Sequence, residues 1–159
     1  MSSFVKKEIN MFDKNLTIPI ASDHGGYDMK KYISEKLQDE GFKVMDMGNN
    51  SLESVDYPDF IHPLARAVNN GEYMFGIILC GSGNGAQMTA NKYPNIRAAL
   101  CWNIEQAELT RKHNEANIIS LPGRFVDFEE AFEMVQSFLH TEFEGGRHKR
   151  RVEKISETK

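Results

Sequence analysis

Short apolar runs alternate with longer amphipathic segments along most of the chain. The runs have the length of strands and lie at 17–22, 43–47, 76–80, 97–101 and 118–121. Apolar residues recur at helical spacing in the segments that follow them, at 27–40, 60–71, 86–92, 104–113 and 127–141. Strict alternation of strands and helices is typical of a parallel sheet with helices on both faces. The pattern therefore predicts an α/β fold, a single three-layer αβα (Rossmann-like) domain with a five-stranded parallel sheet.

The length of 159 residues fits one domain. We expect this domain to span 15–159, after a flexible N-terminal extension at 1–14. Lys6, Lys7 and Glu8 interrupt any apolar segment in the extension, so a signal peptide is not expected. No apolar run approaches the length of a membrane span, about 18 residues. The two cysteines, Cys80 and Cys101, are too few for a disulfide framework, which favours a cytoplasmic protein.

Charge is distributed unevenly along the chain, whose net charge is -4. From Gly145 onward there are six Lys or Arg residues and two Glu residues, whereas the preceding part has 13 basic and 21 acidic residues. The acidic body argues against broad binding to nucleic acid or to anionic membranes. The basic tail follows a helix break at Gly145-Gly146 and is predicted to be helical. On a helix Arg147 and Arg151 would share one face and could hold one phosphate, although a solvated basic tail is the commoner meaning of such a run.

A glycine-rich loop, Gly81-Ser82-Gly83-Asn84-Gly85, joins the strand at 76–80 to the next helix. Its glycines let the backbone approach a ligand and direct several N–H groups to one point, which suits an anion. A plain tight turn is the alternative. A dinucleotide fingerprint also fits formally, but the following strand ends in Cys101-Trp102-Asn103, without the carboxylate that would bind a ribose.

In proteins with a parallel sheet, ligands bind at the carboxyl ends of the strands. Several reactive side chains of this sequence are expected at that edge. Cys80 directly precedes the glycine loop, and converging N–H groups can lower the pKa of a thiol enough to make it a base or nucleophile. Inert packing is the alternative for Cys80 and the expected role of Cys101.

Histidines provide candidate groups for proton transfer near neutral pH. His113 ends a predicted helix, where a simple cationic cap is the plainer role, and His24 follows a strand end. Asp23 either caps the next helix or takes part in the chemistry. His62 and His140 fall within predicted helices and are assigned no role.

Several of these motifs occur together in one known family. The chain resembles the B-type ribose-5-phosphate isomerases and the related galactose-6-phosphate isomerase subunits over about 18–155, with the motifs in the same order. The matching segments are Ser22-Asp23-His24-Gly25-Gly26, Asp56-Tyr57-Pro58, Cys80-Gly81-Ser82-Gly83-Asn84-Gly85, Ala90-Asn91-Lys92, Arg111-Lys112-His113-Asn114, Gly123-Arg124 and Glu144-Gly145-Gly146-Arg147-His148.

The resemblance implies an aldose–ketose isomerase that interconverts ribose 5-phosphate and ribulose 5-phosphate through a cis-enediolate, without a metal or an organic cofactor. It implies that Cys80 is the base that moves a proton between C2 and C1, and that Ser82 and the loop amides hold the enediolate oxygen. It also implies that His113 opens the furanose ring with help from Asp23. The implied sugar and phosphate contacts are His24, Tyr57, Gly81, Gly83, Asn84, Gly85, Asn114, Arg124, Arg147 and Arg151.

The resemblance further implies a homodimer with shared active sites, in which the equivalents of His113 and Arg124 come from the partner. Pairing of dimers into a tetramer stays open. Some family members lack the cysteine and use a glutamate just after the glycine loop, where this chain has Ala86, so the role of base falls to Cys80. Two rival hypotheses remain, an isomerase of allose 6-phosphate or galactose 6-phosphate and a non-catalytic nucleotide-binding module.

Overall fold

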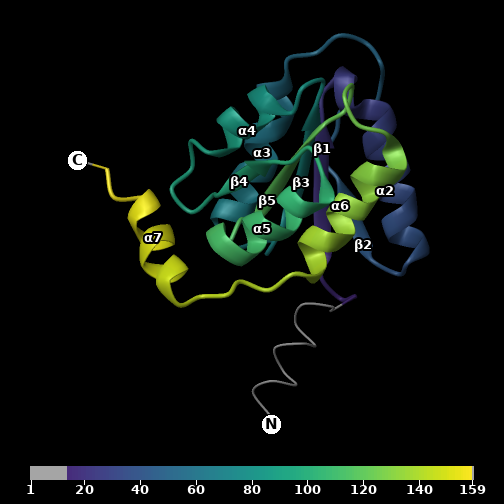
Figure 1. The fold of residues 1–159 in the computed structure, drawn as a ribbon. Coiled ribbons are helices and arrows are strands. Elements are labelled where there is room, and N and C mark those ends of the chain that lie inside the picture. The colour runs from purple at the N-terminus through teal and green to yellow at the C-terminus, as the bar shows by residue number, and fades with distance from the viewer. Residues whose placement is uncertain (1–13, 159) are drawn as a thin grey trace.

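The computed structural model describes residues 14–158, which form a sheet between two layers of helices (Figure 1). The strands are β1 (Thr17–Ser22), β2 (Lys43–Asp46), β3 (Gly76–Cys80), β4 (Ala98–Leu100) and β5 (Ile118–Pro122). All neighbouring strands are parallel, in the order β2-β1-β3-β5-β4. The predicted fold class is therefore confirmed. The expected N-terminal extension lies outside the described residues, except for its last residue, Lys14.

The helices follow the strands as the polarity pattern predicts. They are the short 3-10 helix η1 (His24–Gly26), α2 (Tyr27–Asp39), α3 (Tyr57–Asn69), α4 (Asn84–Ala90), α5 (Ile104–Asn114), α6 (Phe128–His140) and α7 (Arg147–Ile155). Helix α3 begins three residues before the first predicted apolar position, Phe60, because Pro58 in its first turn is compatible with helical φ and needs no hydrogen-bond partner. Among residues 14–158, no helix is both long and apolar enough to cross a membrane.

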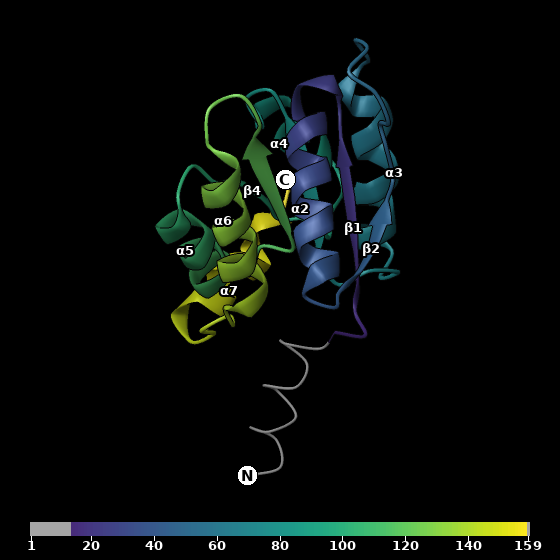
Figure 2. The same ribbon diagram turned by 90° about the vertical axis from the view of Figure 1, so that its right-hand side faces the viewer.

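Two apolar clusters fill the space between the sheet and its helices. One includes side chains of α2 and α6, with Ile77 and Leu79 of β3, and Figure 2 shows these two helices lying side by side. The other includes side chains of α3 and α4, with Ile78 and Cys80 of the same strand. Because successive side chains of a strand point to opposite faces, Cys80 projects toward the α3–α4 face.

The strand order reverses between β1 and β3. From β1 the chain adds β2 on one side, and β3 then pairs with β1 on its other side, with Ser22 beside Leu79. A crevice is expected outside the carboxyl ends of two strands at such a reversal. The loops that follow β1 and β3 therefore occupy the position at which ligands bind in this class of sheet.

Helix α7 lies apart from the layered body in Figure 1. It follows Gly145 and Gly146, whose φ angles of 70° and 55° fall in a region that favours glycine, so the predicted helix break is confirmed. The connecting segment is held to α5 where the Glu144 N–H donates to the Lys112 carbonyl over 3.1 Å. Ile155, near the end of α7, remains 55% exposed, although apolar side chains of this size are commonly buried.

An ion pair between the buried Lys30 and the exposed Asp46 joins α2 to the end of β2. Lys30 is only 2% exposed, and its Nζ lies 2.7 Å from both carboxylate oxygens of Asp46. Asp46 Oδ1 also accepts a hydrogen bond from the Gly48 N–H over 2.9 Å. The pair therefore neutralises a buried ammonium and fixes the start of the loop that follows β2.

The substitution Asp46→Ala is expected to lower the free energy of unfolding by about 1–3 kcal/mol, because it leaves the buried Lys30 ammonium without its anion. Urea denaturation followed by circular dichroism measures the change. Glu108→Ala is the matched control, because it removes the more exposed ion pair with Lys112 and should cost below about 1 kcal/mol. Equal losses in the two variants would contradict the role assigned to Asp46.

Candidate active site

The loops after β1, β3 and β5 meet at the carboxyl edge of the sheet. The Gly123 N–H donates to the Cys80 carbonyl over 2.9 Å, and the Arg124 N–H donates to the Gly81 carbonyl over 3.0 Å. A Cβ on Gly25 would lie 2.9 Å from the Gly81 nitrogen, and one on Gly123 would lie 2.7 Å from the Gly25 carbonyl oxygen. The three loops thus pack backbone against backbone, which places the side chains that follow these strands in one region.

The glycine loop after β3 has a conformation that side chains would disrupt. Gly83 has φ 75°, and a Cβ there would lie 2.6 Å from Leu100 Cδ1. Its carbonyl accepts from Ser120 Oγ over 2.6 Å and from the Gln87 N–H over 3.1 Å. Ser82 is exposed, and its Oγ accepts from the Asn84 N–H over 3.2 Å, which leaves the hydroxyl hydrogen available to a ligand.

Tyr57, at the start of α3, covers the end of this loop. A Cβ on Gly85 would lie 2.5 Å from Tyr57 Cζ and 2.8 Å from its hydroxyl oxygen. The ring can approach so closely only because residue 85 has no side chain. The structure thus brings Tyr57 to the glycine loop from a distant part of the sequence.

Arg124 corrects one expectation. The resemblance implies that this side chain reaches the site from a partner, but its Nη1 lies 3.3 Å from the position of a Cβ on Gly81 of the same chain. The hydrogen bond from its own N–H to the Gly81 carbonyl holds its backbone there. The side chain therefore places a permanent positive charge beside the glycine loop, where it favours an anionic ligand.

Asp23 and His24 are both fixed by backbone groups. Asp23 is 7% exposed, and its Oδ1 accepts from the Gly25 N–H over 2.9 Å, so it does cap η1. His24 Nδ1 lies 3.1 Å from the Val55 nitrogen, whose N–H can only donate. In the neutral ring the proton consequently sits on Nε2 of His24, which is left as a donor. His24 and Arg124 line the same cavity of about 310 Å³, the lower end of the range for small-ligand sites.

The two cysteines differ in their surroundings. Cys101 is 1% exposed, and burial raises the pKa of its thiol to about 12, which agrees with the packing role expected for it. Cys80 is 4% exposed and packs against the α3–α4 cluster, but it ends β3 and continues directly into the glycine loop. Both thiols are free. Cys80 is therefore the thiol that lies where the loops after β1, β3 and β5 meet.

A second group of candidate residues lies around α7. A cavity of about 340 Å³ is lined by His113 and Asn114 of α5 and by His148 and Arg151 of α7, among others. The His113 and His148 rings stack with centroids 4.3 Å apart and planes 14° apart. Burial lowers the pKa of His148, the positive charges of Arg147, His113 and Arg151 lower it further, and the negative charge of Glu144 opposes them in part. Arg147 and Arg151 lie one helical turn apart on α7, as their spacing predicts.

The structure does not bring the two groups together within one chain. Cys80 is the last residue of β3, at the carboxyl edge. Helix α5 runs back from the end of β4 for 11 residues, about 16 Å, so His113 lies near the opposite edge. Three residues past α5, the Asn117 carbonyl accepts from the N–H of Gly76, the first residue of β3. His113, Asn114 and α7 are thus separated from Cys80 by the length of the sheet.

His148 belongs to this second group, although its sequence context predicts no role for it. It is 7% exposed, and its Nε2 lies 3.6 Å from Glu144 Oε1. The short spacing of four residues between Glu144 and His148 is the one signal for their proximity, since Glu144 precedes α7 and is not part of the helix. That signal is common in basic helices and does not reveal the stacking on His113.

Comparisons with known proteins agree with the resemblance. A family model described as Ribose/Galactose Isomerase matches residues 18–155. Ribose-5-phosphate isomerase B of Escherichia coli is 40% identical over 139 residues, which cover 87% of this chain and 93% of that protein. A ribose 5-phosphate isomerase structure from Thermotoga maritima has a TM-score of 0.88 and 47% identity, with 90% of this chain and 99% of that one covered. The Mycoplasma genitalium structure of ribose-5-phosphate isomerase B with bound ribulose-5-phosphate has a TM-score of 0.85 and 44% identity, covering 89% of this chain and 94% of that one.

Native protein treated with iodoacetamide at pH 7.5 is expected to be alkylated at Cys80 at least about tenfold faster than at Cys101, because alkylation requires the thiolate. A pKa of about 12 leaves well under one Cys101 thiol in a thousand ionised at this pH. Peptide mass spectrometry over time measures both rates, and urea-unfolded protein gives the reference reactivity. Protection of Cys80 equal to that of Cys101 would show that its sulfur is inaccessible and would contradict a role in chemistry.

Proposed function

The chain belongs to the ribose/galactose isomerase family, and from this premise we propose that it is an enzyme that interconverts ribose 5-phosphate and ribulose 5-phosphate. The observation that carries the proposal is the glycine loop directly after Cys80, packed against Arg124 and covered by Tyr57. The likeness to a structure that contains ribulose-5-phosphate supports the same substrate pair. The free thiols and the small phosphorylated substrates are those of a cytoplasmic enzyme.

The proposed reaction moves one proton between two neighbouring carbons. The Cys80 thiolate removes the proton from C2 of the open-chain aldose, and the bonding electrons move to the C1 oxygen to give a cis-enediolate. Return of the proton to C1 from the Cys80 thiol, with transfer of the hydroxyl proton between O2 and O1, gives the ketose. Atoms and electrons balance without a redox partner, so the proposed chemistry needs neither a metal nor an organic cofactor.

Stabilisation of the enediolate is assigned to the glycine loop. The negative charge develops on an oxygen during the reaction, and fixed N–H dipoles lower the energy of that state more than that of the substrate. Gly81, Gly83, Asn84 and Gly85 provide the backbone for this role, and the Ser82 hydroxyl adds a donor that is not used within the loop. Arg124 beside Gly81 and the Nε2 donor of His24 are assigned to the anionic substrate on the same chain.

Ring opening is assigned to His113, with Asp23 as its helper. The ring hydroxyl at C1 must lose a proton and the ring oxygen must gain one, and an imidazole can do both near neutral pH. His113 and Cys80 lie at opposite edges of one chain, so a second copy must provide one of them. Asn114, Arg147 and Arg151 accompany His113 on that side and are assigned to the sugar and phosphate groups.

A homodimer is therefore the proposed minimum active form. An open groove of about 570 Å³ lies beside edge strand β4, between α4 and α5, with Asn114 among its lining residues. An unpaired strand edge of this kind is normally covered in a folded assembly. A second copy seated on this face would cover β4 and bring its own Cys80 edge toward His113.

A second candidate function differs from the first in the sugar phosphate that the enzyme would use. The family description includes galactose as well as ribose isomerases, so an enzyme for allose 6-phosphate or galactose 6-phosphate is the alternative. One extra carbon changes transition-state binding by only about 1–3 kcal/mol, and a small pocket difference can supply that energy. The named ribose 5-phosphate isomerases among the relatives favour the pentose phosphate.

Chelator-treated protein is expected to have a kcat/KM for ribose 5-phosphate at least about tenfold above those for allose 6-phosphate and galactose 6-phosphate.

Cys80→Ala should lower kcat for ribose 5-phosphate by about 10²- to 10⁴-fold with little change in KM, because the thiolate acts in the proton-transfer step. Cys101→Ala is the matched control and should retain kcat. A hexose phosphate with the highest kcat/KM would support the alternative, and retained turnover in Cys80→Ala would remove the assigned base.

A mixture of two inactive variants tests the shared site directly. Cys80→Ala and His113→Ala homodimers should each be nearly inactive, because every site then lacks one group. After unfolding and refolding together in equal amounts, half of the dimers are mixed, and each has one site with both wild-type residues. Activity should therefore return to about one quarter of the wild-type value. Each variant refolded alone is the control, and no recovery in the mixture would contradict a site built from two chains.

A further inference from the structure

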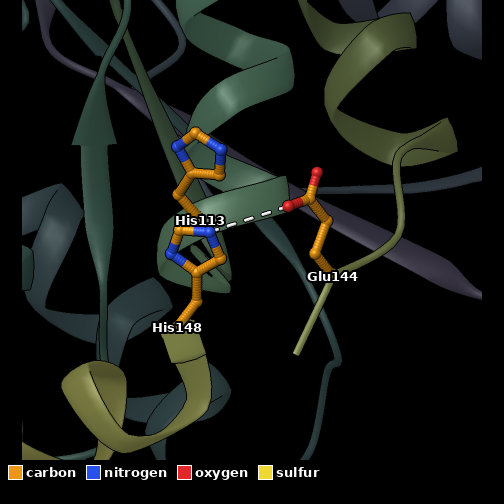
Figure 3. A group of neighbouring side chains, drawn as sticks. All are labelled: His113, Glu144 and His148. Atoms are coloured by element: carbon orange, nitrogen blue, oxygen red, sulfur yellow. Dashed lines mark ion pairs between the residues drawn. The ribbon is translucent and has the colours of Figure 1, made fainter. Parts of the chain in front are cut away.

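Three segments of the chain converge on a cluster of metal-ligating side chains. His113 comes from α5, Glu144 from the segment before α7, and His148 from the first turn of α7, as Figure 3 shows. One ligand atom from each residue can be chosen so that all lie within 4.8 Å of one another. The distance from His148 Nε2 to Glu144 Oε1 is 3.6 Å, close to the separation of two ligands around a tetrahedral ion with bonds of about 2 Å.

One nitrogen of His148 has a single polar neighbour inside this cluster, Glu144 Oε1, with which it forms an ion pair only when the ring is protonated. The residue is 7% exposed, yet its Nε2 has no hydrogen-bond partner among the described residues. In Figure 3 this side of the ring faces Glu144. Buried polar atoms normally have a partner, because leaving one unsatisfied costs about 1–3 kcal/mol. An ion bound between His148 and Glu144 would satisfy this nitrogen.

The chemical types of these side chains suit a metal. Imidazole nitrogens and a carboxylate oxygen are common ligands of divalent transition-metal ions. Glu144 is exposed and provides an anionic oxygen. Two imidazoles and one carboxylate are a ligand set typical of Zn²⁺ and of neighbouring divalent ions, with one position left for water or substrate.

We infer that His113, Glu144 and His148 form a binding site for one divalent transition-metal ion of the Zn²⁺ class. All three ligands come from a single chain, and the ion itself takes no part in the proposed reaction. The His113 and His148 rings stack with centroids 4.3 Å apart and planes 14° apart, so at least one ring must turn about its side-chain torsions to direct both nitrogen lone pairs at one ion. Arg147, Arg151 and Lys112 oppose a dication electrostatically, so binding depends on coordination bonds more than on charge.

Metal binding has a consequence that rests on the proposed function. A nitrogen lone pair of His113 that is bound to a metal cannot accept a proton, so an occupied site blocks ring opening. The same ion ties Glu144 and α7 to α5, the region assigned to the phosphate. The inferred ion is therefore an inhibitor of the isomerase, which acts through His113 and leaves Cys80 unmodified.

The test uses full-length, tag-free protein treated with a chelator and titrated with Co²⁺ in a non-coordinating buffer at pH 7.5. Wild-type protein should bind about one Co²⁺ per chain, with visible absorption of a nitrogen- and oxygen-ligated ion and without the near-ultraviolet band of a Co²⁺–thiolate bond. Zn²⁺ should displace it, and calorimetry with Zn²⁺ alone gives the affinity. His148→Ala and Glu144→Gln should each weaken binding at least about tenfold.

His62→Ala is the matched control, because it removes a half-buried histidine of α3 that bonds Tyr93 and lies outside the cluster. It should bind Co²⁺ as the wild-type protein does. The Glu144→Gln variant is expected to fold as the wild-type protein does. Glu144 is exposed, and its backbone hydrogen bond to Lys112 does not need the carboxylate. Absence of saturable binding, or equal binding by all variants, would overturn the site.

Activity separates the site from the proposed function. Zn²⁺ at saturating concentration should inhibit turnover of ribose 5-phosphate by the wild-type and His62→Ala proteins, and inhibition of Glu144→Gln should need at least about tenfold more Zn²⁺. Saturable binding without inhibition would support the metal site and would contradict the ring-opening role of His113. Inhibition of equal potency in Glu144→Gln would place the inhibiting ion elsewhere and contradict the inference.

Discussion

The direction of the chain in a parallel sheet decides where each functional side chain lies. Every strand ends at the same edge, and every helix that follows it returns toward the opposite edge. Asp23, Cys80 and Arg124 follow strands closely and therefore gather at one edge. His113 ends a helix and is carried to the other edge. This constraint divides the assigned residues into two groups, and it makes a second copy of the chain part of the proposed chemistry.

Most of the fold could be predicted because the local pattern and the final environment agree. The strands at 76–80 and 118–122 are fully buried and almost entirely apolar, with Ser120 the exception, so length and composition are sufficient to predict them. The sequence predicts strand β2 although the strand is largely exposed, because the segment lies between the end of a helix and a polar loop. The start of α3 was predicted too late, because its first turn carries Asp59 and proline and therefore shows no apolar repeat. Strand order could not be read from spacing, since it depends on which crossovers pack best.

The site could be predicted only where it depends on strand ends. The glycine loop and Asp23 lie where the rule for parallel sheets places them. The resemblance implies that Arg124 reaches the site from the partner, but the structure places it beside the glycine loop of its own chain. Its position depends on a backbone contact between the loops after β3 and β5, which no sequence motif reveals. His148 received no role for a similar reason. Its burial results from docking of α7 against α5, a tertiary contact that the sequence of a basic helix does not specify.

The contact between Tyr57 and Gly85 limits how this sequence can diverge. A methyl group at position 85 would overlap the tyrosine ring, at 2.5 Å from Cζ, and would force the ring away from the glycine loop. A chain that acquires a larger residue at 85 can keep the glycine loop covered only if position 57 becomes smaller or moves. The two positions are far apart in the sequence, yet mutations at one determine which mutations the other can accept, so they are expected to coevolve.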